Sequence, residues 1–243
     1  MKYPNYQRNH VILPGRGDEL KKFLKATVSI GGKTVKHKWE NGFSSNSEDA
    51  LTWSCFDVLR NLPHDKITQA LDEMMEDAYD GKLSFSFSND RNINIHIGKR
   101  YETESLPEKE STEVDASVET DSFLFFIEAK LYGTIELPDD RTHKYDQIIK
   151  KLRVGLEVAS RQEKIFYFIF LDLAPMDKML DYGKKALNAE YFKHYKYNNN
   201  NLYNCLYDIT ISERQTFDEI AFNMGWLTWA SLFKTILRAV VAQ

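Results

Sequence analysis

Three charged residues, Asp115, Glu128 and Lys130, lie in a stretch whose pattern otherwise predicts two buried strands. Over residues 112–119 apolar side chains alternate with polar ones, as on a half-buried strand. Thr120–Ser122 has the composition of a turn, and an apolar, aromatic run leads from it to Glu128. Carboxylates and an amine on paired strands are groups that can bind a hard metal ion and transfer protons.

The register of this hairpin decides whether the charges meet. With a two-residue loop at Asp121–Ser122, counting back along the strand places Asp115 directly opposite Glu128. A four-residue loop gives the same pairing, whereas a three-residue loop without a bulge breaks it. Opposed residues share a face of the sheet with Cβ atoms about 5 Å apart, and Lys130 lies on that face too. Two carboxylates in this position repel each other unless a cation lies between them, and a metal ion with a lysine would supply it.

A further acidic residue, Glu48, stands near the start of a helix predicted over Ser45–Leu62. Ser45 and Glu48 have the spacing of a capping box, which by itself explains an acid at this position. The other interpretation is that Glu48 points from the helix start toward the hairpin carboxylates. The two interpretations are compatible.

Asp115, twelve intervening residues and then Glu128-Ala129-Lys130 resemble the signature of the PD-(D/E)XK nuclease superfamily, which has the restriction-endonuclease-like fold. The resemblance covers roughly Ser45 to Asp172, because an acidic helix start precedes the hairpin, and a helix and an apolar strand follow it. Val114 stands where the signature has proline.

The resemblance implies an α/β protein with a restriction-endonuclease-like core, that is, a mixed central β-sheet flanked by helices. It also implies a Mg²⁺-dependent endonuclease, a hydrolase that cleaves phosphodiester bonds, with DNA the expected substrate and Mn²⁺ able to replace Mg²⁺. Asp115, Glu128, Glu48 and the backbone carbonyl of Ala129 would hold the metal, with one ion or two left open. Lys130 would either hold or deprotonate the attacking water or neutralise charge on the phosphorus.

A basic helix predicted over His143–Arg161 carries the candidate substrate contacts. Related nucleases use this helix to contact substrate, so the resemblance makes Lys144, Gln147 and Lys151 candidates for binding the phosphate backbone. An ordinary solvated helix face explains the same residues equally well.

Three interpretations without catalysis remain for the charged cluster, and one of them is an unrelated metal-binding regulatory domain, which would bind metal without cleaving nucleic acid. Without the resemblance, a surface ion pair of Lys130 with Glu128 or Asp115 would be the simpler interpretation. A protein of the nuclease fold could also bind nucleic acid, or serve in an assembly, without cleaving it. Loss of one of the three charged residues would be the expected sign of that state, and all three are present.

The whole chain predicts one domain with additions at both ends. Its 243 residues are 42% hydrophobic and 28% charged, as in ordinary globular proteins. We expect an N-terminal extension with a helix and a hairpin over residues 1–43, the nuclease-like core over 44–175, and a helical region packed on the core over 176–243. The net charge of −4 provides no overall basic field, so nucleic acid must bind through a local patch such as the basic residues of the N-terminal extension.

Several finer expectations follow from local patterns. They are a hairpin of Leu83–Phe87 with Ile93–Ile97, one helix over Asp177–Tyr197, a loop over Asn198–Asn201, and two short helices around Gly225 with Trp229 and Phe233 buried.

The two cysteines, Cys55 and Cys205, lack the spacing of a metal site, and the longest apolar run has only a strand's length. We therefore expect a cytoplasmic protein with reduced thiols and no membrane partner. The oligomeric state is left open, a homodimer included.

Overall fold

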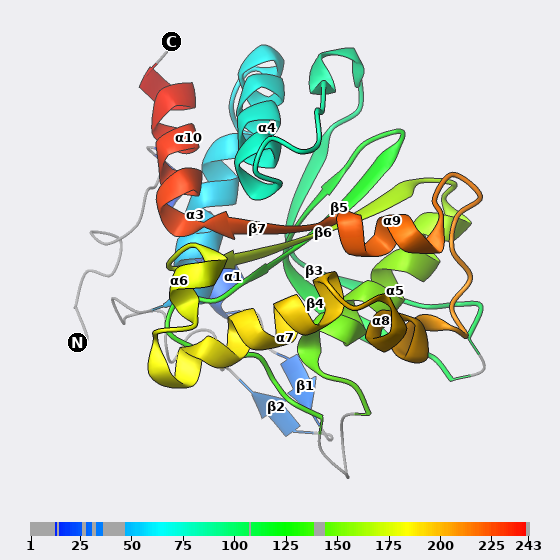
Figure 1. The fold of residues 1–243 in the computed structure, drawn as a ribbon. Helices are drawn as coiled ribbons and strands as arrows, with labels where there is room; N and C mark the ends of the chain where they lie inside the picture. The colour runs from blue at the N-terminus through cyan, green and yellow to red at the C-terminus, as the bar shows by residue number, and fades with distance from the viewer. Residues whose placement is uncertain are drawn as a thin grey trace.

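The computed structural model describes residues 13, 15–25, 28–30, 33–35, 47–106, 108–138 and 144–241. Within them the chain forms a five-stranded sheet of order β3-β4-β5-β6-β7, with helices on both of its faces (Figure 1). The expected α/β class with a mixed central sheet flanked by helices is therefore confirmed.

The sheet changes from antiparallel to parallel at its central strand. Its strands are β3 (Asn94–Glu102), β4 (Ser111–Glu119), β5 (Phe123–Ala129), β6 (Ile165–Asp172) and β7 (Met224–Thr228). β3, β4 and β5 pair antiparallel, whereas β6 pairs parallel with both β5 and β7. β6 is a nearly continuous run of buried apolar residues, as expected of a parallel strand covered on both faces.

Two groups of helices cover the two faces of the sheet (Figure 1). One face carries α3 (Glu48–Arg60), α4 (His64–Ala78) and α10 (Trp229–Val241). The other carries α5 (Gln147–Arg161), α6 (Met176–Met179), α7 (Ala186–Lys196), α8 (Asn199–Leu206) and α9 (Phe217–Phe222). The expected basic helix is thus present as α5, with Asp146 as its N-cap accepting hydrogen bonds from the amides of Ile148 and Ile149. His143 lies outside the described residues.

The N-terminal extension contains the expected helix and hairpin. α1 (Gly17–Lys25) packs its buried Leu20 and Leu24 against Trp53 of α3. β1 (Val28–Ile30) and β2 (Lys33–Val35) pair antiparallel in a separate two-stranded sheet. The turn at Gly31-Gly32 and the basic residues Lys36 and Lys38 lie outside the described residues.

The expected hairpin of Leu83–Phe87 with Ile93–Ile97 is wrong in its first strand. Residues 83–86 pair with no strand of the described chain, and Phe87–Asn89 forms a 3₁₀ turn, η2. The alternation instead reflects two aromatic rings that enter the core: Phe85 and Phe87 stack on each other, and both contact the ring of Phe125. Apolar alternation reports burial, and burial here comes without a hydrogen-bonded ladder.

The expected single helix over Asp177–Tyr197 is also wrong. It is divided into α6, a 3₁₀ turn η3 (Gly183–Lys185) and α7, and the division falls where Gly183 has a φ of +58°. That left-handed conformation is easily adopted by glycine and stops an α-helix. The expected loop over Asn198–Asn201 instead begins α8, because the side chain of Asn198 accepts hydrogen bonds from the amides of Asn200 and Asn201.

The C-terminal region contributes a strand that the sequence did not predict. The two expected short helices are present around Gly225, but Gly225 itself lies in the strand β7 between them, and a Cβ there would lie 2.9 Å from the ring of Tyr79, the residue that follows α4. α9 and α10 stand on either side of this strand in the chain. Trp229 is buried as expected, whereas Phe233 is only partly buried. Residues 176–243 are therefore not purely helical, because they complete the central sheet.

The close packing of α5 on the sheet gives a test of the fold. A Cβ on Gly155 would lie 2.1 Å from the ring of the buried Phe166, so we expect Gly155→Ala to destabilise the protein by about 1 kcal/mol or more. Helix propensity alone predicts the opposite, a stabilisation of about 1 kcal/mol. Urea unfolding decides between them. Gly155→Ala/Phe166→Leu should cost less than the sum of its single variants, and strict additivity would show that the contact is not tight.

Candidate active site

The β4–β5 hairpin brings Asp115 and Glu128 together. Its turn has two residues, since the amide of Thr120 donates to the carbonyl of Phe123 at 2.9 Å, and the ladder continues to the pair Ala116↔Ile127. The paired positions end there, one step before Asp115 and Glu128, the pair that the sequence predicts. Asp115 Oδ2 accepts a hydrogen bond of 2.8 Å from the amide of Ala129, which fixes this carboxylate beside the end of β5.

The neighbouring strand β3 has a local irregularity at the same level. Its pairs with β4 are Ile97↔Ala116 and Lys99↔Val114, so that Gly98 stands across from Asp115. Gly98 has a φ of +64°, which L-residues with a side chain rarely adopt. Such distortions in edge strands re-aim the side chains beside them. A glycine at this position therefore lets the ladder continue past Asp115 without breaking the register.

Glu128 is held between two lysines. Its side chain is 1% exposed, and its Oε1 accepts a hydrogen bond of 2.9 Å from Lys130 Nζ. Lys151 Nζ of α5 lies 3.0 Å from Oε2, although this oxygen accepts no well-directed hydrogen bond from the described residues. Burial alone would raise the pKa of Glu128, but the charges of Lys130 and Lys151 hold it below its usual value. Glu128 is therefore an ionised, buried carboxylate.

Lys130 is the cation on which the acidic groups converge. Burial lowers its pKa, but the charges of Glu128, Asp115 and Glu48 outweigh burial and raise the pKa well above its usual value. Its ammonium group therefore stays protonated at neutral pH in this arrangement. The lysine is 8% exposed, so its charge acts in surroundings that screen it weakly.

Asp115 differs from Glu128 in its protonation state. Burial and then the charge of Glu128 raise its pKa to about 8, against the opposing influence of Lys130 and Lys151. The two opposed carboxylates thus differ, since Glu128 is ionised and Asp115 holds a proton up to mildly alkaline pH. A cation bound between the two carboxylates would favour the ionised form of both.

Glu48 reaches the site from the opposite face of the sheet. The N-cap of α3 is Ser47, whose hydroxyl accepts from the amide of Ala50, and Glu48 is the first helical residue. Glu48 Oε2 accepts a hydrogen bond of 2.6 Å from the amide of Leu131, and its Oε1 lies 3.7 Å from Lys130 Nζ. Burial raises the pKa of Glu48. The expected capping box of Ser45 with Glu48 is wrong, because Glu48 is the first helical residue and not the third, and its carboxylate points toward the hairpin.

The donor set fits a hard divalent cation in its chemistry. It offers three carboxylates, the backbone carbonyl of Ala129 beside them, and the buried Glu128 Oε2 with unused acceptor capacity. Among the described residues, however, no three His, Cys, Asp or Glu side chains lie close enough together to hold a metal ion as they stand. A metal could bind only if Glu48 or Glu128 turned away from Lys130 toward a common point.

The three candidate substrate contacts have different surroundings. Lys144 is exposed, with its ammonium group 5.0 Å from the centre of the Tyr145 ring. Gln147 begins α5 and accepts a hydrogen bond of 3.2 Å from the amide of Glu136. Lys151 is 5% exposed and contacts Glu128 and the carbonyl of Glu113. A small hollow of about 180 Å³ lies between Glu136, Gln147 and Lys151.

Two basic residues of α5, Lys151 and Arg153, do not lie on a solvated helix face. Lys151 belongs to the charged cluster, and Arg153 is 2% exposed, with ion pairs to Glu110 and Asp208. The helical spacing could have indicated that Lys151 is buried, because Lys151 follows the buried Ile148 by three positions and precedes the buried Gly155 by four. A lysine on the face that packs on the sheet needs a buried acid, and Glu128 supplies it.

No family model, curated protein or solved structure matches the chain. No helix in the part of the chain that the structure describes has the length and apolar character needed to cross a membrane.

The raised pKa of Asp115 predicts how stability depends on pH. Because the folded pKa of about 8 exceeds the ordinary value of 3.8, the contribution of Asp115 to the free energy of unfolding is most favourable below about pH 4 and is lost as the pH rises through 8. Asp115→Asn keeps an acceptor for the Ala129 amide but cannot ionise. With chelator present, this variant should be more stable than the natural protein at pH 9, by on the order of 1–3 kcal/mol, and similar to it at pH 4.

Thermal unfolding between pH 4 and 9 measures this difference. Asp181→Asn, which changes an exposed acid in the turn after α6, is the matched control and should follow the natural protein at every pH. Parallel pH curves for Asp115→Asn and the natural protein would contradict the prediction.

Proposed function

We propose that this protein is a metal-dependent nuclease of the PD-(D/E)XK type, with a restriction-endonuclease-like core, that hydrolyses phosphodiester bonds, with DNA the expected substrate. The observation that carries the proposal is that Asp115 Oδ2 accepts a hydrogen bond of 2.8 Å from the amide of Ala129, next to Glu128, with Lys130 Nζ 2.9 Å from the Glu128 carboxylate. Glu48 adds a third carboxylate from α3.

Mg²⁺, or Mn²⁺ in its place, would be held by Asp115, Glu128, Glu48 and the carbonyl of Ala129, and would supply Lewis-acid activation of the phosphate and of a bound water. The amide of Ala129 orients Asp115, and the amide of Leu131 orients Glu48. These backbone donors fix two of the carboxylates without neutralising them. Binding of a cation would therefore need the carboxylates to move closer together from these hydrogen-bonded positions.

Of the two roles open to Lys130, neutralising the charge that develops on the phosphorus is the better supported. A general base must lose its proton near neutral pH, and the surrounding carboxylates raise the pKa of Lys130 well above that range. An ammonium ion that stays charged stabilises negative charge on the reacting phosphate instead. Lys151 has the same sign but is buried beside Glu128 Oε2, so it orients that carboxylate.

The N-terminal end of α5 offers the candidate surface for nucleic acid, where lysines stand among the acids Glu108, Glu110, Glu113 and Glu136. The hollow near Gln147 is polar, and the exposed Lys144 and the partly exposed Lys150 border the adjoining surface. Phosphate groups of a nucleic-acid backbone would be attracted there. Lys144 and Gln147 are our candidates for such contacts, whereas the burial of Lys151 favours the role at Glu128.

One observation favours a second candidate function, a nucleic-acid-binding or assembly protein of the same fold without catalysis. Lysines stand at both oxygens of Glu128, so the carboxylate already has positive charge where a metal would be bound. In such a protein Lys151 would replace the metal permanently. The same experiment separates the two functions, since this candidate binds nucleic acid but does not cleave it.

Cleavage assays test the proposed function directly. Purified protein should cleave at least one of supercoiled plasmid, linear duplex, single-stranded DNA and RNA with Mg²⁺ or Mn²⁺, and EDTA should abolish the activity. Asp115→Ala and Glu128→Ala should each lower the rate at least about 100-fold, and Lys130→Ala should do so while keeping metal affinity. Lys184→Ala, at an exposed site in η3, is the control for loss of a cation. Activity that persists in Lys130→Ala would indicate a contaminant, and cleavage of none of these substrates would refute the proposal.

Glu48→Gln separates metal binding from positioning. Glutamine keeps an acceptor for the amide of Leu131 but loses the charge near Lys130. If Glu48 is a ligand, we expect cleavage at least about tenfold slower at low Mg²⁺ and partial recovery as Mg²⁺ is raised. Asp65→Asn, in the first turn of α4, controls for the loss of an acid at a helix N-terminus. Unchanged cleavage at every Mg²⁺ concentration would remove Glu48 from the site.

A further inference from the structure

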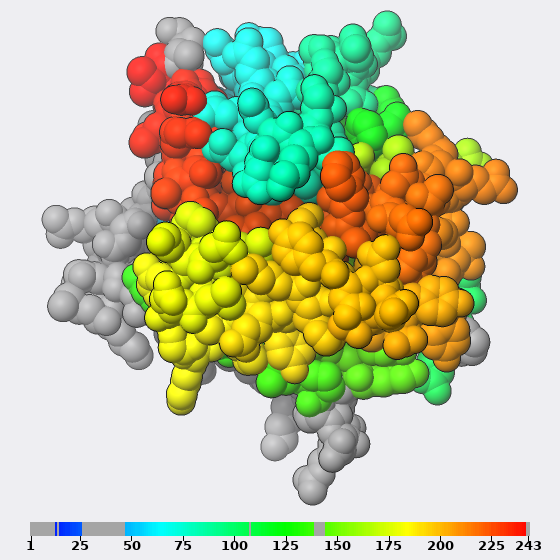
Figure 2. Space-filling model, in the orientation of Figure 1, coloured from blue at the N-terminus to red at the C-terminus, as the bar shows by residue number. Residues whose placement is uncertain are grey.

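A second pocket lies where three segments distant in the sequence meet. The end of α4, α7 and the stretch from α9 into β7 come together on the face shown in Figure 2, in teal, yellow and orange. The pocket has a volume of about 260 Å³. None of the carboxylates of the candidate active site lines it. It is therefore a separate site.

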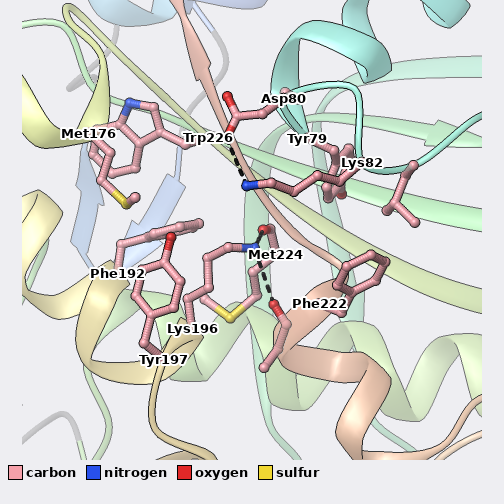
Figure 3. Close-up of a pocket in the computed structure, with 13 residues that line it drawn as sticks. Tyr79, Asp80, Lys82, Met176, Phe192, Lys196, Tyr197, Phe222, Met224 and Trp226 are labelled. Carbon is pink, nitrogen blue, oxygen red and sulfur yellow. Dashed lines mark hydrogen bonds and ion pairs between the residues drawn. The ribbon is translucent and has the colours of Figure 1, made fainter.

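The pocket has an aromatic floor and an aromatic rim. Phe192 and Trp226 form part of the floor, where their rings pack edge to face with centroids 5.2 Å apart. At the rim, Phe222 and Tyr197 are 48% and 64% exposed. Figure 3 shows these two rim rings on opposite sides of the pocket. Solvent-exposed aromatic rings that face a hollow are suited to stacking against a flat ring.

Two ammonium groups point into the same space (Figure 3). Lys196 Nζ donates to the carbonyls of Ala221 and Met224 and has no carboxylate partner among the residues that the structure describes. An ammonium ion has three hydrogens to donate, so one remains for a ligand. Burial, and then the charge of Lys82, lower the pKa of Lys196 to about 8, as expected for a cation that lacks a counter-ion.

Lys82 is available to a ligand because its own ion pair is weak. Its Nζ lies 3.4 Å from Asp80 Oδ2, and both side chains are largely exposed, at 64% and 80%. Exposed pairs of this kind contribute little free energy, so a more highly charged anion can take the place of Asp80. Two cations against one carboxylate leave the pocket with a positive charge.

We propose that this pocket binds a nucleoside monophosphate unit, with the base against the aromatic rim and the phosphate at the two ammonium groups. A phosphate monoester carries a charge of about −1.5 to −2 at neutral pH, which matches two lysines better than the single charge of a carboxylate does. The volume lies just below the usual range of small-molecule sites, about 300–1,000 Å³, so it suits one nucleotide and not a longer stretch of chain. The unit could be a free nucleotide or the 5′-phosphorylated end of a strand.

Isothermal titration calorimetry with the full chain tests the proposal, with AMP and TMP as probes. We expect AMP or TMP to bind, and the matching nucleoside and inorganic phosphate to bind at least about tenfold more weakly, since each lacks one half of the recognised unit. A single-stranded octanucleotide with and without a 5′-phosphate distinguishes the two sources. Preference for the phosphorylated strand over the free nucleotide indicates a strand end, and the reverse preference indicates a free nucleotide.

Variants of the residues that line the pocket test whether the nucleotide binds there. Phe222→Ala and Lys82→Ala should each weaken AMP or TMP binding about tenfold. Both change exposed side chains and should leave the melting temperature unchanged. Tyr207→Ala and Lys184→Ala remove an exposed aromatic ring and an exposed cation that do not line the pocket, and should bind as the natural protein does.

The result of the nucleotide-binding experiment does not depend on the nuclease proposal. Lys130→Ala should bind AMP or TMP normally even if it abolishes cleavage, because Lys130 does not line the pocket. No binding of either nucleotide at millimolar concentration would overturn the inference, as would binding that neither Phe222→Ala nor Lys82→Ala weakens, or nucleosides that bind as tightly as their phosphates.

Discussion

The buried negative charge at the end of the β4–β5 hairpin is the constraint on which the surrounding structure depends. The buried carboxylate of Glu128 and the partly buried carboxylates of Asp115 and Glu48 lie near the ammonium groups of Lys130 and Lys151. An isolated carboxylate in such surroundings would be strongly destabilising, so the fold must bring cations and hydrogen-bond donors to it. α3 supplies Glu48 from one face of the sheet, and α5 supplies Lys151 from the other. The two helical layers are therefore connected through this one cluster.

The C-terminal region holds the backbone that carries Lys130. The indole Nε1 of Trp229, at the start of α10, donates to the carbonyl of Lys130 at 3.0 Å. Lys185 Nζ donates to the carbonyl of Leu131 at 2.9 Å and pairs with the fully buried Asp172 at the end of β6. The chain after residue 175 thus determines where Lys130 and Leu131 lie, and through the amide of Leu131 it also determines where Glu48 lies. An addition to the core would not be expected to have this role.

Local sequence patterns predicted the parts of the fold that local interactions determine. Period-two alternation and a two-residue turn were sufficient to predict the hairpin register as far as Ala116↔Ile127, because a register error would have turned the hydrophobic set of each strand to the wrong face. The helices α3, α4 and α5 followed from apolar residues at helical spacing. The strand β7 could not be found in this way. Its five residues border helices on both sides, and what makes them a strand is the edge of β6 and the ring of Tyr79.

Dependence on distant residues also explains why local patterns did not predict the burial of Lys151 and Arg153. Both side chains are basic, and charged residues are mostly exposed, so a helix that carries them suggests a solvated face. Their burial depends on acids from other elements, Glu128 of β5 for Lys151, and Glu110 and Asp208 for Arg153. An ion pair between residues that are distant in the sequence does not change the hydrophobic periodicity of either segment. The sequence indicated which residues can do chemistry, but not which of them neutralise one another.

The energetics of the cluster favour a functional origin over a structural one. Replacing a buried charge cluster by apolar residues of similar volume is often neutral or stabilising, so stability alone gives no reason to place Asp115 where its pKa rises to about 8. A charge pair of Lys130 with Glu128 would suffice to hold β5, and Asp115 and Glu48 add repulsion to it. Unfavourable local electrostatics of this kind are typical of sites whose ligand supplies the missing charge. Additional positive charge would favour the ionised form of Asp115, and the partner this calls for is a cation bound through oxygen.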